Sequence, residues 1–151
     1  MHATRIICAT LILGVSLGVT AMAQWKPVEG QLMTRWAQNV SPDNVWPEYP
    51  RPQMVREHWQ NLNGLWDYAI APSVTESAPD TWEGQILVPF AIESALSGVK
   101  KAVRPDQTLW YRRTFTVPDK LRDQRLLLHF GAVDWECTVY VNGVYCGRHQ
   151  G

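Results

Sequence analysis

Asp134 and Glu136 are the two residues whose types and spacing come nearest to a catalytic arrangement. They are two positions apart on a predicted strand, so both side chains point the same way with Cα atoms roughly 7 Å apart. Paired carboxyl groups act as general acid and base in the hydrolysis of glycosidic bonds. Such groups flank the reacting bond from opposite walls of a cleft, which neighbours on one strand generally cannot do. We therefore favour a solvated or ion-paired strand entry over a catalytic pair.

The remaining nucleophilic and metal-ligating residues are scattered along the chain. His58, His129 and His149 form no Ser-His-Asp or Cys-His constellation that spacing reveals. Cys137, Cys146 and His149 lack the close-paired spacing of metal ligands. The glycine-rich patterns of phosphate-binding loops are absent from the sequence. We expect no catalytic residue, no metal site and no cofactor in this chain.

Tryptophan is unusually frequent, with eight residues in a chain of 151. A buried tryptophan removes ~150 to 250 Å² from water, so either a core or a binding surface accounts for the number. Four fall at strand ends or within strand patterns and are expected in the core: Trp59, Trp66, Trp110 and Trp135. Trp82, beside Glu83 and Gly84 in a predicted loop, is the better candidate for stacking on a sugar ring.

The charges of the chain balance, with 14 basic and 14 acidic residues and 19% charged residues in all. Nucleic-acid binding requires a basic excess, so nucleic acid is an unexpected partner. No acidic block marks a disordered tail.

Residues 1–23 have the pattern of a secretory signal peptide: Arg5, an apolar run over 6–19, and the small-x-small exit Ala21-Met22-Ala23. The apolar run of about 14 residues is shorter than the roughly 17 to 25 that cross a bilayer, so a retained anchor is the lesser alternative. We expect cleavage after Ala23, export to the periplasm or the exterior, and no membrane association afterwards.

Cys137 and Cys146 lie on either side of Asn142-Gly143, the strongest short signal for a two-residue hairpin turn. Pairing outward from that turn places Val139 opposite Cys146 and Cys137 opposite Arg148. The two cysteines then lie diagonally on one face, with Cα atoms roughly 7 to 8 Å apart, whereas a disulfide prefers less than about 7 Å. We favour two buried thiols and keep a Cys137–Cys146 disulfide as the alternative, because an exported chain meets an oxidising compartment.

These residues are positioned by short strands that follow a proline-containing lead-in. Residues 24–56 carry five prolines without sustained periodicity, and the tryptophans among them predict a lead-in that lies against the domain formed by 57–151. Strands are predicted over 65–70, 85–88, 109–117, 124–130, 136–141 and 144–147, with a helical turn or two at 92–98. Several short strands without long helices indicate an all-β sandwich, jelly roll or barrel.

Alternation along the strands predicts the core face. One face of the strand at 109–117 carries apolar side chains, and Arg113 interrupts it. A charge in this register needs a partner, which Asp134 or Glu136 would supply. We favour an arginine at the rim of the sheet over one that faces a substrate.

Residues 51–151 also resemble a known protein family. The chain resembles the N-terminal sugar-binding domain of glycoside hydrolase family 2 at RPQ (51–53), LNGLWDY (62–68), VPF with IES (88–90, 92–94), LWYRRTF (109–115), VYVNG (139–143) and GRHQG (147–151). Single pieces such as Asn-Gly are weak signals, whereas the ordered set is specific.

The resemblance implies a galactose-binding-like jelly roll at the front of a retaining β-glycosidase. In that family an immunoglobulin-like domain and a (β/α)8 barrel follow, and two glutamates of the barrel perform the catalysis. No segment of this chain matches those motifs, so we carry over no catalytic residue and expect this chain alone to be inactive. The implied partners are a β-glycoside substrate and the downstream domains.

About six predicted strands are fewer than the eight of a jelly roll, so we expect a fragment of a longer reading frame, truncated at its C-terminal end. A free-standing carbohydrate-binding module is the alternative, for which the tryptophan count is the main support.

Overall fold

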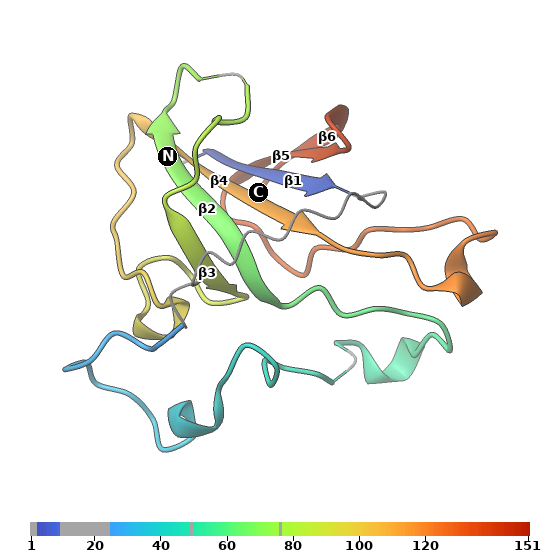
Figure 1. The fold of residues 1–151 in the computed structure, drawn as a ribbon, viewed down its shortest axis with the longest axis horizontal. Helices are drawn as coiled ribbons and strands as arrows, with labels where there is room; N and C mark the ends of the chain where they lie inside the picture. The colour runs from blue at the N-terminus through green and yellow to red at the C-terminus, as the bar shows by residue number, and fades with distance from the viewer. Residues whose placement is uncertain (1–2, 10–24, 49, 76) are drawn as a thin grey trace, which may run out of the picture.

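The computed structural model describes residues 3–9, 25–48, 50–75 and 77–151 (Figure 1). Its strands are β1 (Ala3–Ala9), β2 (Gly64–Pro72), β3 (Gly84–Val88), β4 (Gln107–Thr114), β5 (Glu136–Val141) and β6 (Val144–Gln150). The helical elements among these residues are 3₁₀ turns of three residues each: η1 (Ala37–Asn39), η2 (Pro52–Met54), η3 (Ala95–Ser97) and η4 (Asp119–Leu121). The prediction of an all-β fold is confirmed, and the architecture is consistent with a β-sandwich.

The six strands belong to one sheet in the order β3-β2-β4-β1-β5-β6. β2 is antiparallel to both β3 and β4, and β5 and β6 form an antiparallel hairpin. β1 lies between β4 and β5 and is parallel to both. It comes from the expected signal peptide, whose residues 10–23 lie outside the described residues.

Five of the six predicted strands form at the expected places, as β2 to β6. The strand predicted over 124–130 is wrong, because this segment is not paired with a neighbouring strand in the part of the chain that the structure describes. Alternating apolar residues favour an extended chain, but a strand also needs a ladder of hydrogen bonds to a partner. The helical turn predicted within 92–98 is confirmed as η3.

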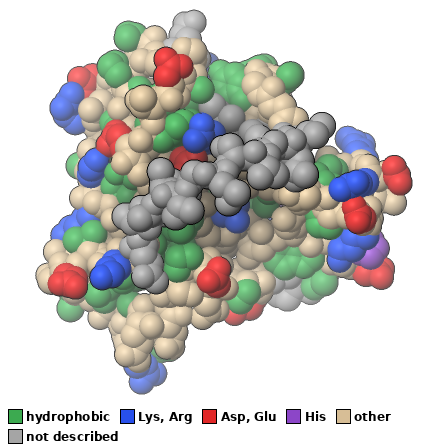
Figure 2. All heavy atoms as spheres, viewed as in Figure 1, with side chains coloured by type: hydrophobic (Ala, Val, Ile, Leu, Met, Phe, Trp, Pro, Cys, Tyr) green, Lys and Arg blue, Asp and Glu red, His purple; other side chains and the backbone are tan. Residues whose placement is uncertain are grey.

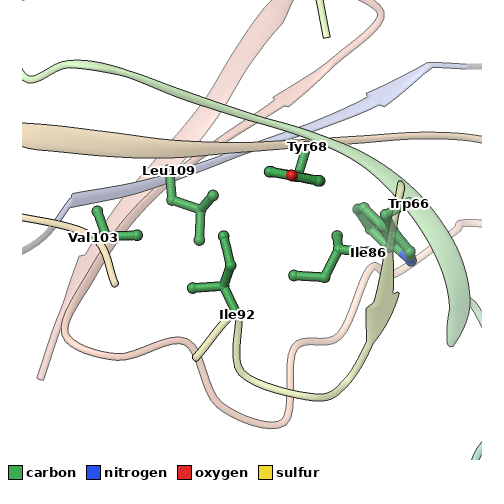
Figure 3. Packing of buried hydrophobic residues seen from close by; sticks show 6 residues of the cluster. All are labelled: Trp66, Tyr68, Ile86, Ile92, Val103 and Leu109. Carbon is green, nitrogen blue, oxygen red and sulfur yellow. The ribbon is translucent and has the colours of Figure 1, made fainter. Parts of the chain in front are cut away.

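The core lies on one face of β2, β3 and β4 (Figure 3). Alternate positions of a strand point to the same face, so Trp66 and Tyr68 of β2 both enter the core, with Ile86 of β3 beside them. The connection between β3 and β4 covers this face with Ile92 and Val103. Burial of each large apolar side chain stabilises the fold by about 1.5–3 kcal/mol.

The predicted core face of β4 is confirmed, since Leu109 is buried in this cluster and Tyr111 packs against it. The tryptophan prediction holds for Trp66 and Trp110, which are 5% and 1% exposed. It is wrong for Trp135, which is 39% exposed and immediately precedes β5. Trp59 is half-buried.

The lead-in contacts the domain at two places. Trp25 lies against Gly98, where an added Cβ would be 2.7 Å from the indole ring. Trp46 meets Phe90 edge to face, with ring centroids 5.9 Å apart, and its carbonyl accepts a hydrogen bond from Asn61. The lead-in therefore packs along the domain (blue to cyan in Figure 1).

The β5–β6 hairpin turns at Asn142 and Gly143, whose φ angles of 52° and 78° are those of the predicted type of turn. Val141 pairs with Val144 as predicted, but a bulge follows and Val139 pairs with Gly147. The predicted pairing of Val139 with Cys146 is therefore wrong. A bulge adds one residue to one strand only, which shifts every later pair.

The bulge also separates the two cysteine environments. Cys137 pairs with His149 instead of Arg148. Cys137 is buried and Cys146 is exposed, and both thiols are free. The prediction of two buried thiols is confirmed for Cys137 and wrong for Cys146.

Candidate functional site

A row of polar side chains crosses the sheet on the face opposite the core. Asp67 of β2 is in register with Gln85 of β3 on one side and with Arg112 of β4 on the other. Each is one position away from a core residue, so strand alternation places all three on the outer face. The sheet thus gathers one carboxylate, one amide and one guanidinium from three strands.

Arg112 is held by two partners. Its Nε and Nη2 donate hydrogen bonds to Oδ2 of Asp67 at 3.0 and 2.8 Å. Its Cζ lies 4.4 Å from the centroid of the Trp82 ring, in a cation–π contact. The structure therefore brings Trp82, the predicted sugar-stacking residue, next to the polar row. Arg112 covers one face of the indole, so a ligand ring would stack only on the other.

A polar hollow of about 270 Å³ opens at this row. Its lining residues are Leu65, Asp67, Gln85, Arg112, Arg113 and Thr114. Arg113 is held at the rim, where its Nη1 donates to the carbonyl of Leu65 at 2.9 Å. Burial lowers the pKa of Arg113.

Asp134 or Glu136 was expected to pair with Arg113, and for Glu136 this expectation is wrong. Glu136 accepts hydrogen bonds from Arg148 at 2.9 and 2.8 Å and from Gln150 at 2.7 Å. This pairing agrees with the ion-paired strand entry favoured for Glu136. Asp134 lines a separate apolar groove instead. The carbonyl of Leu65 accepts from Nη1 of Arg113, whereas the buried Nε of Arg113 has no hydrogen-bond partner among the residues that the structure describes.

The arrangement suits a polyhydroxylated ligand better than a reaction. Planar carboxylate, amide and guanidinium groups donate to and accept from neighbouring hydroxyl groups, and an indole offers an apolar face to a sugar ring. Asp67 is the single carboxylate among the described residues that line the hollow, and Arg112 already binds it. The hollow therefore offers no pair of acids.

Of the other candidate residues, Cys137 and His149 are directly opposite each other on β5 and β6, and both line the groove that Asp134 and Cys146 also line. His149 Nε2 lies 3.0 Å from the carbonyl oxygen of Gly151. Within residues 3–9, 25–48, 50–75 and 77–151, no group of three His, Cys, Asp or Glu residues is arranged to hold a metal ion. Over the same residues, none of the helical segments has the length and apolar character to span a membrane.

Figure 2 shows basic and acidic side chains intermingled over the described part of the face that it presents.

Comparison with known proteins relates the chain to glycosidases. It is 27% identical over 109 residues to a β-glucuronidase of Paenibacillus borealis, covering 68% of this chain and 18% of that protein. It is 25% identical over 103 residues to a β-glucuronidase of Streptococcus agalactiae, covering 68% of this chain and 17% of that protein. A β-galactosidase of Thermoanaerobacter pseudethanolicus is 38% identical over 42 residues, which are 28% of this chain and 6% of that protein. No family model matches the chain.

The chain therefore spans less than a fifth of the length of the curated relatives it matches.

Proposed function

We propose that this chain is the N-terminal, non-catalytic domain of an exported retaining β-glycosidase, where it contacts sugar and packs on the rest of the enzyme. The observation that carries the proposal is the similarity to two β-glucuronidases over 68% of this chain. The matching region is 18% and 17% of those proteins, a share suited to one domain of several. The ordered segments that resemble glycoside hydrolase family 2 support the same assignment.

Catalysis in this proposal belongs to a barrel that lies outside the 151 residues. A retaining mechanism needs two carboxyl groups about 5–5.5 Å apart across the scissile bond. Of the two carboxylates whose spacing comes nearest to such a role, Glu136 binds Arg148 and Asp134 lines a separate groove. The carboxylate of the hollow, Asp67, binds Arg112. The chain alone is therefore expected to bind without hydrolysing.

Sugar contact is assigned to the polar hollow at Asp67, Gln85 and Arg112, where Trp82 contributes by packing against Arg112. Export to the periplasm or the exterior is proposed from the pattern of residues 1–23.

Hydrolysis and binding assays on the 151-residue chain test these assignments. We expect no hydrolysis of 4-nitrophenyl β-D-glucuronide or β-D-galactoside above the rate in buffer. We expect weak saturable binding of glucuronate or galactose by NMR titration, abolished in Trp82→Ala and kept in Trp36→Ala. Trp36 is the matched control because it is 61% exposed on the lead-in. Measurable hydrolysis contradicts the non-catalytic assignment, and equal binding by the two variants contradicts the role of Trp82.

A free-standing carbohydrate-binding module is the second candidate, which the neighbouring Trp82 and polar row favour. Such a module binds oligosaccharides on its own, whereas an entrance domain contributes only part of a site. Submicromolar binding of an oligosaccharide by this chain would favour the module. An open reading frame that continues past codon 151 into a barrel with two catalytic glutamates would favour the glycosidase domain.

A further inference from the structure

The loop that leads into β3 is held to the sheet by Glu83, the residue next to Trp82. The N–H of Glu83 donates a hydrogen bond to the carbonyl of Tyr68 at 3.0 Å. Its carboxylate accepts a hydrogen bond from the N–H of Ile70 at 2.8 Å through Oε1, and one from Nζ of Lys101 at 2.6 Å through Oε2. The backbone and both carboxylate oxygens of one residue therefore hold the end of this loop.

These contacts begin where the ladder between β2 and β3 ends. Tyr68 and Gly84 are the last paired residues, and beyond them the N–H of Ile70 donates to the side chain of Glu83. A strand N–H that loses its backbone partner needs another acceptor. Because a side chain supplies it here, the chain before Gly84 can leave the ladder and turn over the sheet.

Lys101, the cationic partner of Glu83, is itself anchored to the core. Its N–H donates to the carbonyl of Ile92 at 3.2 Å, and Ile92 is a buried core residue. Its ammonium group lies 5.4 Å from the centroid of the Tyr68 ring, which also belongs to the core. These contacts limit the side-chain entropy that an exposed ion pair loses when it forms.

Trp82 lies between this anchor and the candidate sugar site. Its ring centroid is 4.4 Å from Cζ of Arg112, and the same guanidinium binds Asp67 and lines the polar hollow. A binding group that must first be ordered loses affinity, so its geometry depends on the residues that support it. Glu83 gives Trp82 this support through contacts that all join residues described by the structure.

We propose that Glu83 is a positioning residue of the candidate sugar site. It holds the loop so that Trp82 packs on Arg112, and Trp82 in turn keeps the guanidinium at Asp67 and the hollow. The consequence for binding rests on the proposed sugar contact, whereas the positioning is a property of the chain without a ligand.

Glu83→Ala and Glu83→Gln separate the two contacts of the carboxylate. Glutamine keeps an acceptor for the N–H of Ile70 and loses only the charge that Lys101 binds. That ion pair is partly exposed, so its loss has a small effect. Alanine removes both contacts. We therefore expect Glu83→Ala to release Trp82 from Arg112 and Glu83→Gln to keep it in place.

The first test follows the Nε–H signal of Arg112 by NMR in the nitrogen-15-labelled 151-residue chain. Arg112→Lys removes this signal and so assigns it. The ring current of a nearby indole shifts the signal of such a proton, so Trp82→Ala should move it. Glu83→Ala should reproduce most of the shift that Trp82→Ala causes, whereas Glu83→Gln should reproduce little of it.

Gly143→Ala is the control for a general loss of stability. Gly143 lies in the β5–β6 hairpin, at the opposite edge of the sheet from β3 (Figure 1). Its positive φ makes alanine unfavourable there, but the substitution should leave the Arg112 signal in place. A signal that Glu83→Ala does not move, or that Gly143→Ala moves as far, overturns the proposal.

The second test repeats the titration with glucuronate or galactose on the same variants. Glu83→Ala should lose the saturable binding, as Trp82→Ala does, and Glu83→Gln should keep it. Binding that Glu83→Ala leaves intact contradicts the role of Glu83 at the sugar site. If the unaltered chain binds neither sugar, the sugar assignment itself fails, and the Arg112 signal then decides whether Glu83 positions Trp82.

Discussion

Arg112 donates two hydrogen bonds to a single oxygen of Asp67, a residue 45 positions earlier in the chain. The two residues are directly opposite each other on β4 and β2. The same guanidinium lies over Trp82, which precedes β3. One side chain therefore connects two strands to the loop that enters a third, and it fixes the candidate sugar site.

Arg112→Lys tests whether the guanidinium shape matters. Lysine keeps the charge but not the fork that reaches Asp67 through two nitrogens. Because the two side chains are 40% and 30% exposed, we expect a loss of about 1 kcal/mol in the free energy of unfolding by urea. Arg104→Lys, at a more exposed pair with Asp106, should leave the free energy of unfolding unchanged within the error of the measurement. Equal effects of the two substitutions would remove the special role of Arg112.

Gly98 is the point where the lead-in approaches the domain most closely. It ends η3 in the left-handed conformation, with φ at 79°, and an added Cβ would lie 2.7 Å from Trp25. Gly98→Ala therefore combines a backbone cost with a clash. Gly143 has φ at 78° and open space around it, so Gly143→Ala carries the backbone cost alone, about 1–2 kcal/mol.

We expect Gly98→Ala to cost at least about 1 kcal/mol more than Gly143→Ala in urea unfolding, because Trp25 must move. In a Trp25→Ala background this excess should shrink, because only the carbonyl oxygen of Lys26, 3.2 Å from the added Cβ, still crowds it; a double-mutant cycle measures the difference. An excess that Trp25→Ala leaves unchanged would mean that the indole does not bear on Gly98.

The strands of the hairpin and the core were predictable because their signals are local. Asn142-Gly143 specifies the turn, and alternation along β2 and β4 places Trp66 and Leu109 in the core. The bulge at Cys146 was not predictable in this way, since alternation carries no sign of one inserted residue. Apolar side chains alternate over residues 126–130 as in a strand. No backbone–backbone hydrogen bond joins residues 125–133 to a neighbouring strand in the part of the chain that the structure describes.

The candidate site was only half predictable for a related reason. Trp82 stood out by its type and its loop position. Asp67 and Arg112 lie within the two segments, LNGLWDY and LWYRRTF, that carry the family resemblance. Their pairing depends on the register between β2 and β4, and register is a property of the assembled sheet that no single segment encodes.

Cys137 and Cys146 should differ sharply in reactivity. Cys146 is exposed and Cys137 is 5% exposed, and burial keeps a thiol from reagents. We expect one thiol equivalent to react rapidly with Ellman's reagent in the native 151-residue chain carrying Cys8→Ser, and the second only in urea. Cys146→Ser should abolish the rapid phase. A chain in which neither thiol reacts until a reductant is added would contain the alternative Cys137–Cys146 disulfide.

The Glu83–Lys101 pair should make stability depend on pH at both extremes. Burial acts to raise the pKa of Glu83, but hydrogen bonds from Lys101 and from the N–H of Ile70 outweigh it, so the pKa lies below its ordinary value. The hydrogen bond to Glu83 raises the pKa of Lys101. Glu83 therefore stabilises the fold above roughly pH 4.3 and loses this effect as the pH falls through its folded-state pKa. Lys101 stabilises below roughly pH 10.4 and loses this effect as the pH rises further.

Glu83→Gln tests how much of the loss of stability in acid comes from the Glu83–Lys101 pair. Glutamine keeps an acceptor for the N–H of Ile70 but loses the charge that Lys101 binds. Because both side chains are partly exposed, at 36% and 47%, we expect the fall in unfolding free energy between pH 6 and pH 3 to shrink by only about 0.5 kcal/mol. Glu57→Gln, which removes an exposed carboxylate, should leave that fall unchanged. If the stability of the two variants falls alike between pH 6 and pH 3, the Glu83–Lys101 pair does not cause the loss in acid, and other carboxylates do.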